Sequence, residues 1–243
     1  MKIKNEVKYI RNKFIPKQRE KKFFLRTISY INHLLSTKYV YNFDWFGIPI
    51  IQFPSDIIAI QEVIFKYKPD IVIETGVAYG GSLIYYSSLL TLLGRKFKKI
   101  IGIDIFFRSK NLKILKNHPL FKNISLFKSS SIDNDLHKKL LRITKNKKVI
   151  VVLDSNHTEK HVLEELNKYS KYIKKNGYII VLDTVIEFIR PSLNDPDRGF
   201  KKGNNPYTAI KKFLKKNKNF KIESYYTNKS AISSAYGGFL KRI

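Results

Sequence analysis

The chain has 243 residues, of which 43% are hydrophobic and 14% aromatic, so it can form a sizeable core and is not expected to be disordered. It contains no cysteine, which excludes disulfides and thiolate metal sites and favours a reducing compartment. The net charge of +28 has two explanations, an anionic partner or a lysine-rich composition, and the even spread of charge along the chain favours composition.

Residues 1–42 are expected to form a basic, mostly helical extension before one large domain of residues 43–243. Apolar side chains recur at helical spacing within residues 23–41. The basic N-terminus lacks the apolar core of a signal peptide, and no apolar run approaches the roughly 18 residues that span a bilayer. We therefore expect a cytoplasmic protein, with peripheral contact between the basic extension and the inner membrane face.

Beyond the extension, short apolar runs alternate with amphipathic segments. Strands are expected at residues 70–75, 99–105, 124–130, 148–156, 177–184, 220–227 and 234–243, the last two as an antiparallel pair. Helices are expected at residues 57–66, 81–93, 111–119, 133–144, 158–176 and 206–217. This alternation implies right-handed crossovers and predicts an α/β fold with a doubly wound, mostly parallel, seven-stranded Rossmann-like sheet. The long loop 185–205 is expected to form a lid or to contact substrate.

The segment DIVIETGVAYGGS (residues 70–82) places an acid and three glycines between a strand and a helix. Gly76 suits a tight turn, while Gly80 and Gly81 allow close approach of a ligand and free the first amides of the helix. The G-x-x-x-G-G spacing lacks the lysine of a phosphate loop, and Glu74 would repel phosphate. The segment instead favours a ligand with an ammonium group, such as S-adenosylmethionine.

Two further strand ends carry side chains suited to an adenosyl group. Asp104 ends the second strand of the domain, where a carboxylate accepts hydrogen bonds from a ribose diol. Ser129, Ser130 and Ser131 end the third strand, where small hydroxyls either reach an adenine edge or cap the next helix. Together with Glu74, these residues predict an adenosyl ligand at the carboxyl end of the sheet.

The fourth and fifth strands end in Asp154 and Asp183, two acids able to bind Mg²⁺ beside the methyl donor. A metal ion there would lower the pKa of a substrate hydroxyl. His157 is the candidate general base, because its ordinary pKa near 6.5 suits proton abstraction at neutral pH. The alternative is that His157 only begins the next helix.

Several motifs also carry a resemblance to a known family. The motifs E-T-G-x-x-x-G-G-S at residues 74–82 and L-D-S-N-H at residues 153–157, with GYIIVLDT and NPYTAIKKFL, resemble the cephalosporin hydroxylase and rhamnosyl O-methyltransferase family. The resemblance runs from about residue 43 to the end of the chain. It implies a class I S-adenosylmethionine-dependent O-methyltransferase that acts on a hydroxyl of a sugar, glycolipid or secondary metabolite, and it favours a homo-oligomer.

The expected site residues fall into three groups. Those predicted to bind the cofactor are Glu74, Gly76, Gly80, Gly81, Ser82, Asp104 and Ser130. His157 and Asp154 are the predicted catalytic residues, and Asp154 and Asp183 the predicted metal ligands. In the resembling family the fifth-strand motif commonly ends in two acids, whereas this chain has Leu182 before Asp183, so one carboxylate is missing and metal dependence stays open.

Two other functions compete with this interpretation. The net charge and the aromatic content support a basic RNA-binding protein or RNA methyltransferase. No RNA-binding motif is visible, however, and the charge is diffuse, so a nucleic-acid partner is not expected. The second alternative, suggested by Leu182 in place of an acid, is a degenerate protein that binds S-adenosylmethionine without activity.

Overall fold

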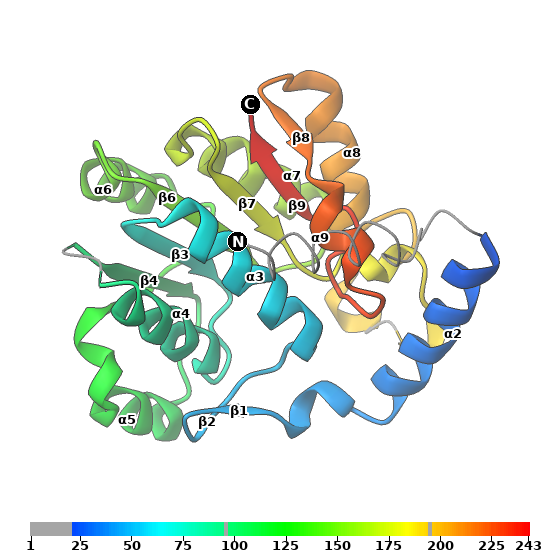
Figure 1. Cartoon of the computed structure of the whole chain (residues 1–243), viewed down its shortest axis with the longest axis horizontal. Coiled ribbons are helices and arrows are strands. Elements are labelled where there is room, and N and C mark those ends of the chain that lie inside the picture. Colours follow the sequence, from blue (N-terminus) through cyan, green and yellow to red (C-terminus); the bar gives the residue numbers. More distant parts are fainter. Residues whose placement is uncertain (1–20, 95–96, 194–195) are drawn as a thin grey trace, which may run out of the picture.

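The computed structural model describes residues 21–94, 97–193 and 196–243. A central sheet with helices on both faces dominates the fold (Figure 1). Its strands are β3 (Ile71–Thr75), β4 (Lys99–Asp104), β5 (Ile124–Lys128), β6 (Val149–Leu153), β7 (Tyr178–Val181), β8 (Phe220–Ile222) and β9 (Phe239–Arg242). The strand order is β5-β4-β3-β6-β7-β9-β8, with β9 antiparallel to both of its neighbours and the remaining pairs parallel. The predicted seven-stranded, mostly parallel sheet is therefore confirmed.

Successive side chains of the strands enter two separate cores, because a β-strand points alternate residues to opposite faces. On one face, α3 (Pro54–Tyr67) and α4 (Gly81–Leu92) pack on residues such as Val72 and Ile150. On the other face, α6 (Asn134–Thr144), α7 (Glu159–Tyr169) and α8 (Pro206–Lys216) pack on residues such as Ile73 and Val151. The unbroken apolar strands are thus explained by burial on both sides.

The remaining elements lie around this frame. They are α2 (Lys21–Ser36), α5 (Ser109–Asn117), α9 (Ser224–Lys229), the short hairpin β1 (Asp44–Trp45) and β2 (Ile48–Pro49), and several single turns of 3₁₀ helix. Three of these turns, Thr184–Glu187, Pro191–Leu193 and Pro196–Arg198, fall in the loop expected at residues 185–205. The loop is therefore more structured than its sequence indicates.

Several boundaries differ from the sequence-based prediction. The strand predicted at residues 220–227 ends at Ile222, and Ser224–Lys229 form helix α9. The strand predicted at residues 234–243 begins only at Phe239. The first domain helix begins at Pro54 and not near residue 57, because a proline fits the first helical position, where its missing N–H is not needed. The fifth strand of the domain ends at Val181, so Leu182 and Asp183 lie beyond it, and Asp183 adopts a left-handed backbone conformation with φ of 55°.

The described part of the extension, α2, packs against the segment that follows β7 (Figure 1). Ile28, Ile31 and Leu34 of this helix share a buried cluster with Ile186 and Phe200. Residues 1–20 of the predicted extension lie outside the described residues. Among the described residues, none of the helices combines the length and apolar character that a membrane crossing requires.

Candidate functional site: two cavities that meet at Asp154

A cavity of about 580 Å³ opens at the carboxyl ends of β3, β4, β5 and β6. This is the edge of an open α/β sheet at which ligands bind, and the volume falls within the range of small-molecule sites. The residues lining this first cavity are Gly76, Ala78, Ile103, Asp104, Ile105, Phe106, Arg108, Ser129, Ser130, Ser131, Asp154, Ser155, Asn156, His161 and Arg198. Of the predicted cofactor residues, it thus collects Gly76, Asp104 and Ser130.

Each glycine of the turn after β3 is required for a different structural reason. Gly76 has a φ of 82°, and a Cβ there would lie 2.1 Å from the carbonyl oxygen of Asp154. A Cβ on Gly81 would lie 2.3 Å from the carbonyl oxygen of Pro49. The close approach expected for a ligand at Gly81 is therefore made by the β1–β2 hairpin. Gly81 and Ser82 do line a smaller hollow that also touches Gly76 and Asp154.

Glu74 lies beneath this turn, fully buried and outside the lining of the first cavity. Ser82 donates a hydrogen bond of 2.6 Å to its Oε2, and the Tyr86 hydroxyl donates one of 2.9 Å to its Oε1. Burial raises the pKa of Glu74 to about 8, against the effect of these two hydrogen bonds. The structure thus gives Glu74 no direct access to the first cavity, and Ser82, which lines the smaller hollow, is the side chain that connects Glu74 to the site.

Asp104 ends β4 and forms part of the cavity wall. The backbone N–H of Val77 donates to its Oδ2 at 2.8 Å, and that of Phe106 donates to its Oδ1 at 3.0 Å. These bonds fix the orientation of the carboxylate and join the β4 end to the glycine turn. Each oxygen of a carboxylate accepts two hydrogen bonds, so both can still accept from a diol.

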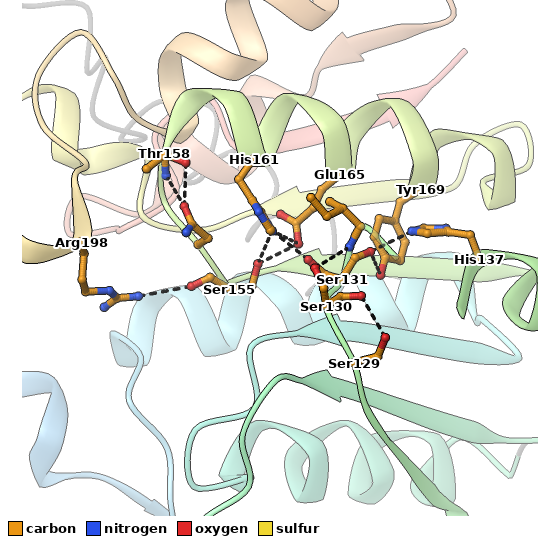
Figure 2. A network of polar contacts seen from close by, with 12 residues as sticks. Ser129, Ser130, Ser131, His137, Ser155, Thr158, His161, Glu165, Tyr169 and Arg198 are labelled. Carbon is orange, nitrogen blue, oxygen red and sulfur yellow. Dashed lines mark hydrogen bonds and ion pairs between the residues drawn. The ribbon is translucent and has the colours of Figure 1, made fainter. Parts of the chain in front are cut away.

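A polar network lies at the ends of β5 and β6 and on α7, beside the first cavity (Figure 2). The Ser131 hydroxyl lies 2.9 Å from Nε2 of His161, and the Ser155 hydroxyl donates to Oε1 of Glu165 at 2.7 Å. Nε2 of His161 also lies 3.7 Å from Oε1 of Glu165. Glu165 is fully buried, and its Oε2 has no hydrogen-bond partner among the described residues.

The carbonyl oxygen of Ser131 anchors the other side of this network. It accepts a hydrogen bond of 2.9 Å from the Tyr169 hydroxyl and lies 2.8 Å from Nε2 of His137. His137 is therefore buried and forms part of the structural support of this network. Two residues of this network, His161 and Glu165, were not predicted as site residues. Their i, i+4 spacing on a predicted helix was the signal that they share one face.

A second cavity, of about 330 Å³, adjoins the first. Its walls come mainly from the segment after β7 and from residues 35–53, which begin in the last turn of α2. The lining residues are Leu35, Val40, Tyr41, Ile51, Gln52, Phe53, Asp154, His157, Leu182, Asp183, Val185, Ile186, Ile189, Leu193, Arg198, Phe200 and Ser234. Both cavities share Asp154 and Arg198. A molecule in one cavity therefore meets a molecule in the other at these two side chains.

Asp154, His157 and Asp183 converge at this junction. One ligand atom from each of the three residues lies within 4.8 Å of the others, and Nε2 of His157 lies 3.3 Å from Oδ2 of Asp183. Burial, followed by the charge of Asp183, raises the pKa of Asp154 well above its usual range. Burial lowers the pKa of His157, while the charge of Asp183 acts in the opposite direction. The predicted catalytic residues and metal ligands thus lie in one cluster.

Asp183 is held in place from behind. The Thr184 hydroxyl and the Val185 backbone N–H both donate to the carbonyl oxygen of Ser234, at 3.1 and 3.0 Å. The buried carboxylate of Asp56 in turn accepts a hydrogen bond of 2.7 Å from the Ser234 N–H. Leu182 is buried and faces the second cavity, so a hydrocarbon side chain adjoins the cluster where the resembling family has a carboxylate.

Trp45 lies in strand β1 of the short hairpin. Its indole N–H donates to the Ser88 hydroxyl at 3.1 Å, and its ring packs edge-on against Tyr85 with centroids 4.9 Å apart. It lines neither cavity. Trp45 therefore anchors the hairpin to α4.

Comparisons with known proteins agree with this architecture. The family described as Rhamnosyl O-methyltransferase/CmcI matches residues 37–243. A rhamnosyl O-methyltransferase of Mycobacterium tuberculosis (strain H37Rv) is 30% identical over 217 residues, covering 88% of this chain and 82% of that protein. One from Mycobacterium leprae is 28% identical over 172 residues, covering 70% of this chain and 69% of that protein.

Two solved structures show the same fold. CmcI with Mg and SAM superposes with a TM-score of 0.56 at 16% identity, covering 84% of this chain and 77% of that one. An apo structure of CmcI gives a TM-score of 0.58 at 17% identity with the same coverage. The family match and the mycobacterial relatives together show that the chain belongs to the rhamnosyl O-methyltransferase/CmcI family, which confirms the enzyme class predicted from the sequence, an O-methyltransferase.

Proposed function

We propose that the chain transfers the methyl group of S-adenosylmethionine to a hydroxyl of a sugar or of a small molecule that carries a sugar. The junction of the two cavities at Asp154 carries this proposal. Methyl transfer needs a donor and an acceptor held in line, and two cavities with one shared wall provide that arrangement. The sugar is the acceptor class because the matched mycobacterial relatives are rhamnosyl O-methyltransferases.

In this proposal the first cavity holds the donor. Asp104 accepts hydrogen bonds from the ribose diol, and Ser130 and Ser131 lie where they can contact the adenine edge. Gly76 and Ser82 flank the smaller hollow that leads toward Asp154, which suits the methionine part. Glu74 lies beneath the turn, and the hydrogen bond from Ser82 joins it to this hollow.

The second cavity holds the acceptor in this proposal, with its hydroxyl directed at the Asp154–His157–Asp183 cluster. Proton removal from that hydroxyl belongs to this cluster, since it contains the titratable groups nearest the junction. The two carboxylates suit a divalent ion such as Mg²⁺, which lowers the pKa of a hydroxyl when bound. Without an ion, His157 is the group able to accept the proton.

The expectations on partners and location belong to the same proposal. A homo-oligomer, a cytoplasmic location and peripheral contact with the inner membrane face are supported by the family resemblance and by the basic extension. The RNA alternative is supported by the +28 charge and the aromatic content. Binding to a mixed RNA pool at low salt would distinguish it, because a glycan methyltransferase is expected to show none.

The direct test is transfer from methyl-labelled S-adenosylmethionine to a panel of sugars, nucleotide sugars and glycolipid extracts. The expected result is label in a sugar-containing fraction, with loss of transfer in an Asp104→Ala variant. Calorimetry with S-adenosylhomocysteine provides a measurement that needs no acceptor. No binding of this product by the folded protein would contradict the donor assignment.

A further inference from the structure

We propose that Asp154, His157 and Asp183 form a binding site for one divalent transition-metal ion, with Nε2 of His157 as a nitrogen ligand. The inference deepens the proposed function, on which it rests, by naming the class of ion that this site prefers. It also gives His157 a role other than that of a free general base.

The first argument is the convergence of three ligand atoms on one point. One carboxylate oxygen from each aspartate and an imidazole nitrogen lie within 4.8 Å of one another. Ligand atoms sit roughly 2.0–2.2 Å from a bound transition metal, so two of them are at most about 4.4 Å apart. Small side-chain movements therefore bring the three atoms into one coordination sphere.

The second argument concerns the ring nitrogen that faces the cluster. Where a carboxylate orients a general base, it holds the ring nitrogen opposite to the one that takes the proton. Here Nε2 of His157 lies 3.3 Å from Oδ2 of Asp183. The imidazole is also almost fully buried, with its ring packed edge-on against Phe200 at a centroid distance of 5.3 Å. Nε2 of His157 therefore faces the same point as the Asp183 carboxylate, as expected for two ligands of one ion.

The third argument is electrostatic. The carboxylates of Asp154 and Asp183 approach each other closely, and two like charges at this distance repel unless a cation or a proton lies between them. Arg198 lines both cavities, but its guanidinium donates to the carbonyl oxygen of Ser155 and packs over Phe200. A divalent cation at the centre of the cluster would neutralise both carboxylates.

The neighbouring Leu182 decides the class of ion. Its buried side chain faces the same cavity and offers no ligand atom, so the third protein ligand is an imidazole and not a carboxylate. Mg²⁺ prefers oxygen ligands, whereas imidazole suits ions such as Co²⁺, Ni²⁺ and Zn²⁺. The site is therefore expected to gain more affinity for these ions from His157 than it does for Mg²⁺.

Calorimetric titration of the full chain with Co²⁺ and with Mg²⁺ tests this inference. His157→Gln should lower Co²⁺ affinity at least about tenfold and leave Mg²⁺ affinity nearly unchanged. His161→Gln is the matched control, because His161 lies on the Ser131–Glu165 network outside the cluster. It should leave the affinity for both ions unchanged. Equal Co²⁺ affinity in the His157→Gln variant and the unmodified protein would overturn the proposal.

A spectroscopic measurement on the unmodified protein covers the case in which the variant does not fold. Pulsed electron paramagnetic resonance of bound Mn²⁺ should show coupling to an imidazole nitrogen, and its absence would also overturn the proposal. Leu182→Glu adds a carboxylate and should raise Mg²⁺ affinity about tenfold or more. Parallel titration with S-adenosylhomocysteine separates the two proposals: product binding without metal binding contradicts only the metal site, and metal binding without product binding contradicts the donor assignment.

Discussion

The α-carbon of Gly76 approaches the carbonyl oxygen of Asp154 so closely that a Cβ there would lie 2.1 Å from that oxygen. The glycine turn after β3 is thereby pressed against the end of β6, and both residues of this contact line the first cavity. The two strand ends can approach each other this closely only because residue 76 is a glycine and carries no Cβ.

Gly76→Ala is expected to destabilise the protein by about 3 kcal/mol or more, through backbone overlap and a φ of 82°. Urea unfolding measures the loss. Gly203→Ala is the matched control, because Gly203 has a φ of 81° and an added Cβ there meets no atom within 4 Å. It should cost only about 1 kcal/mol from the left-handed conformation. Equal losses in both variants would mean that the contact with Asp154 is unimportant.

Asp104→Ala should weaken S-adenosylhomocysteine binding about 100-fold. The change removes the predicted acceptor for the ribose diol and leaves the N–H groups of Val77 and Phe106 without their carboxylate. Calorimetry measures the affinity, and Asp135→Asn, at an exposed position on α6, controls for the change in net charge. Unchanged affinity in Asp104→Ala would place the ribose elsewhere.

The burial of Glu74 leads us to expect that the free energy of unfolding falls as the pH rises. Burial raises its pKa in the folded protein to about 8 from an ordinary value of 4.5, so between these values the folded state binds the proton more tightly than the unfolded state. The contribution of Glu74 to stability is therefore full below about pH 4.5 and is lost as the pH rises through 8. The loss is on the order of 4 kcal/mol.

Glu74→Gln removes this titration, so the fall in unfolding free energy between pH 5 and pH 9 should be smaller in the variant than in the unmodified protein. Urea unfolding at both pH values measures the difference. Glu62→Gln, at a partly exposed carboxylate paired with Lys229, is the control and should leave the fall unchanged. An identical fall in Glu74→Gln would show that Glu74 is already ionised in the folded state.

Glu165→Ala should destabilise the protein by about 3 kcal/mol, because it leaves a cavity and removes the acceptor of the Ser155 hydroxyl. It should also weaken S-adenosylhomocysteine binding, since Ser155 and His161 belong to the cavity wall. His161→Gln is expected to reduce product affinity with a smaller loss of stability. If Glu165→Ala lowers stability alone, the network supports the fold without shaping the donor site.

The sequence was sufficient to place the strand ends but not the contacts made by the helices. Asp104 and Asp154 were expected at one edge because the carboxyl ends of parallel strands meet there, and they line the same cavity. The hydrogen bonds that Ser82 and Tyr86 donate to Glu74 depend on how α4 is rotated about its axis. That rotation follows from packing over long sequence separations, which a local pattern does not contain.

The same limit applies to two further features. His161 lines the first cavity, and Glu165 lies buried behind it, because α7 packs with one particular face toward β6; helical spacing alone does not select that face. The contact between Gly81 and Pro49 joins the turn to a hairpin that precedes α3 in the chain. Hydrophobic periodicity predicts elements, whereas such pairings arise only when the elements assemble.

The position of α2 has a consequence for how acceptor choice can change over evolution. The family match begins at residue 37, one residue after this helix ends, yet Leu35 from its last turn lines the second cavity and the helix packs on the segment after β7. The first cavity, by contrast, is lined wholly by residues within the family match. Under the proposed assignment of the two cavities, substitutions in α2 can therefore reshape the acceptor side and leave the lining of the donor side intact, so acceptor choice can change through a helix that lies outside the matched family model.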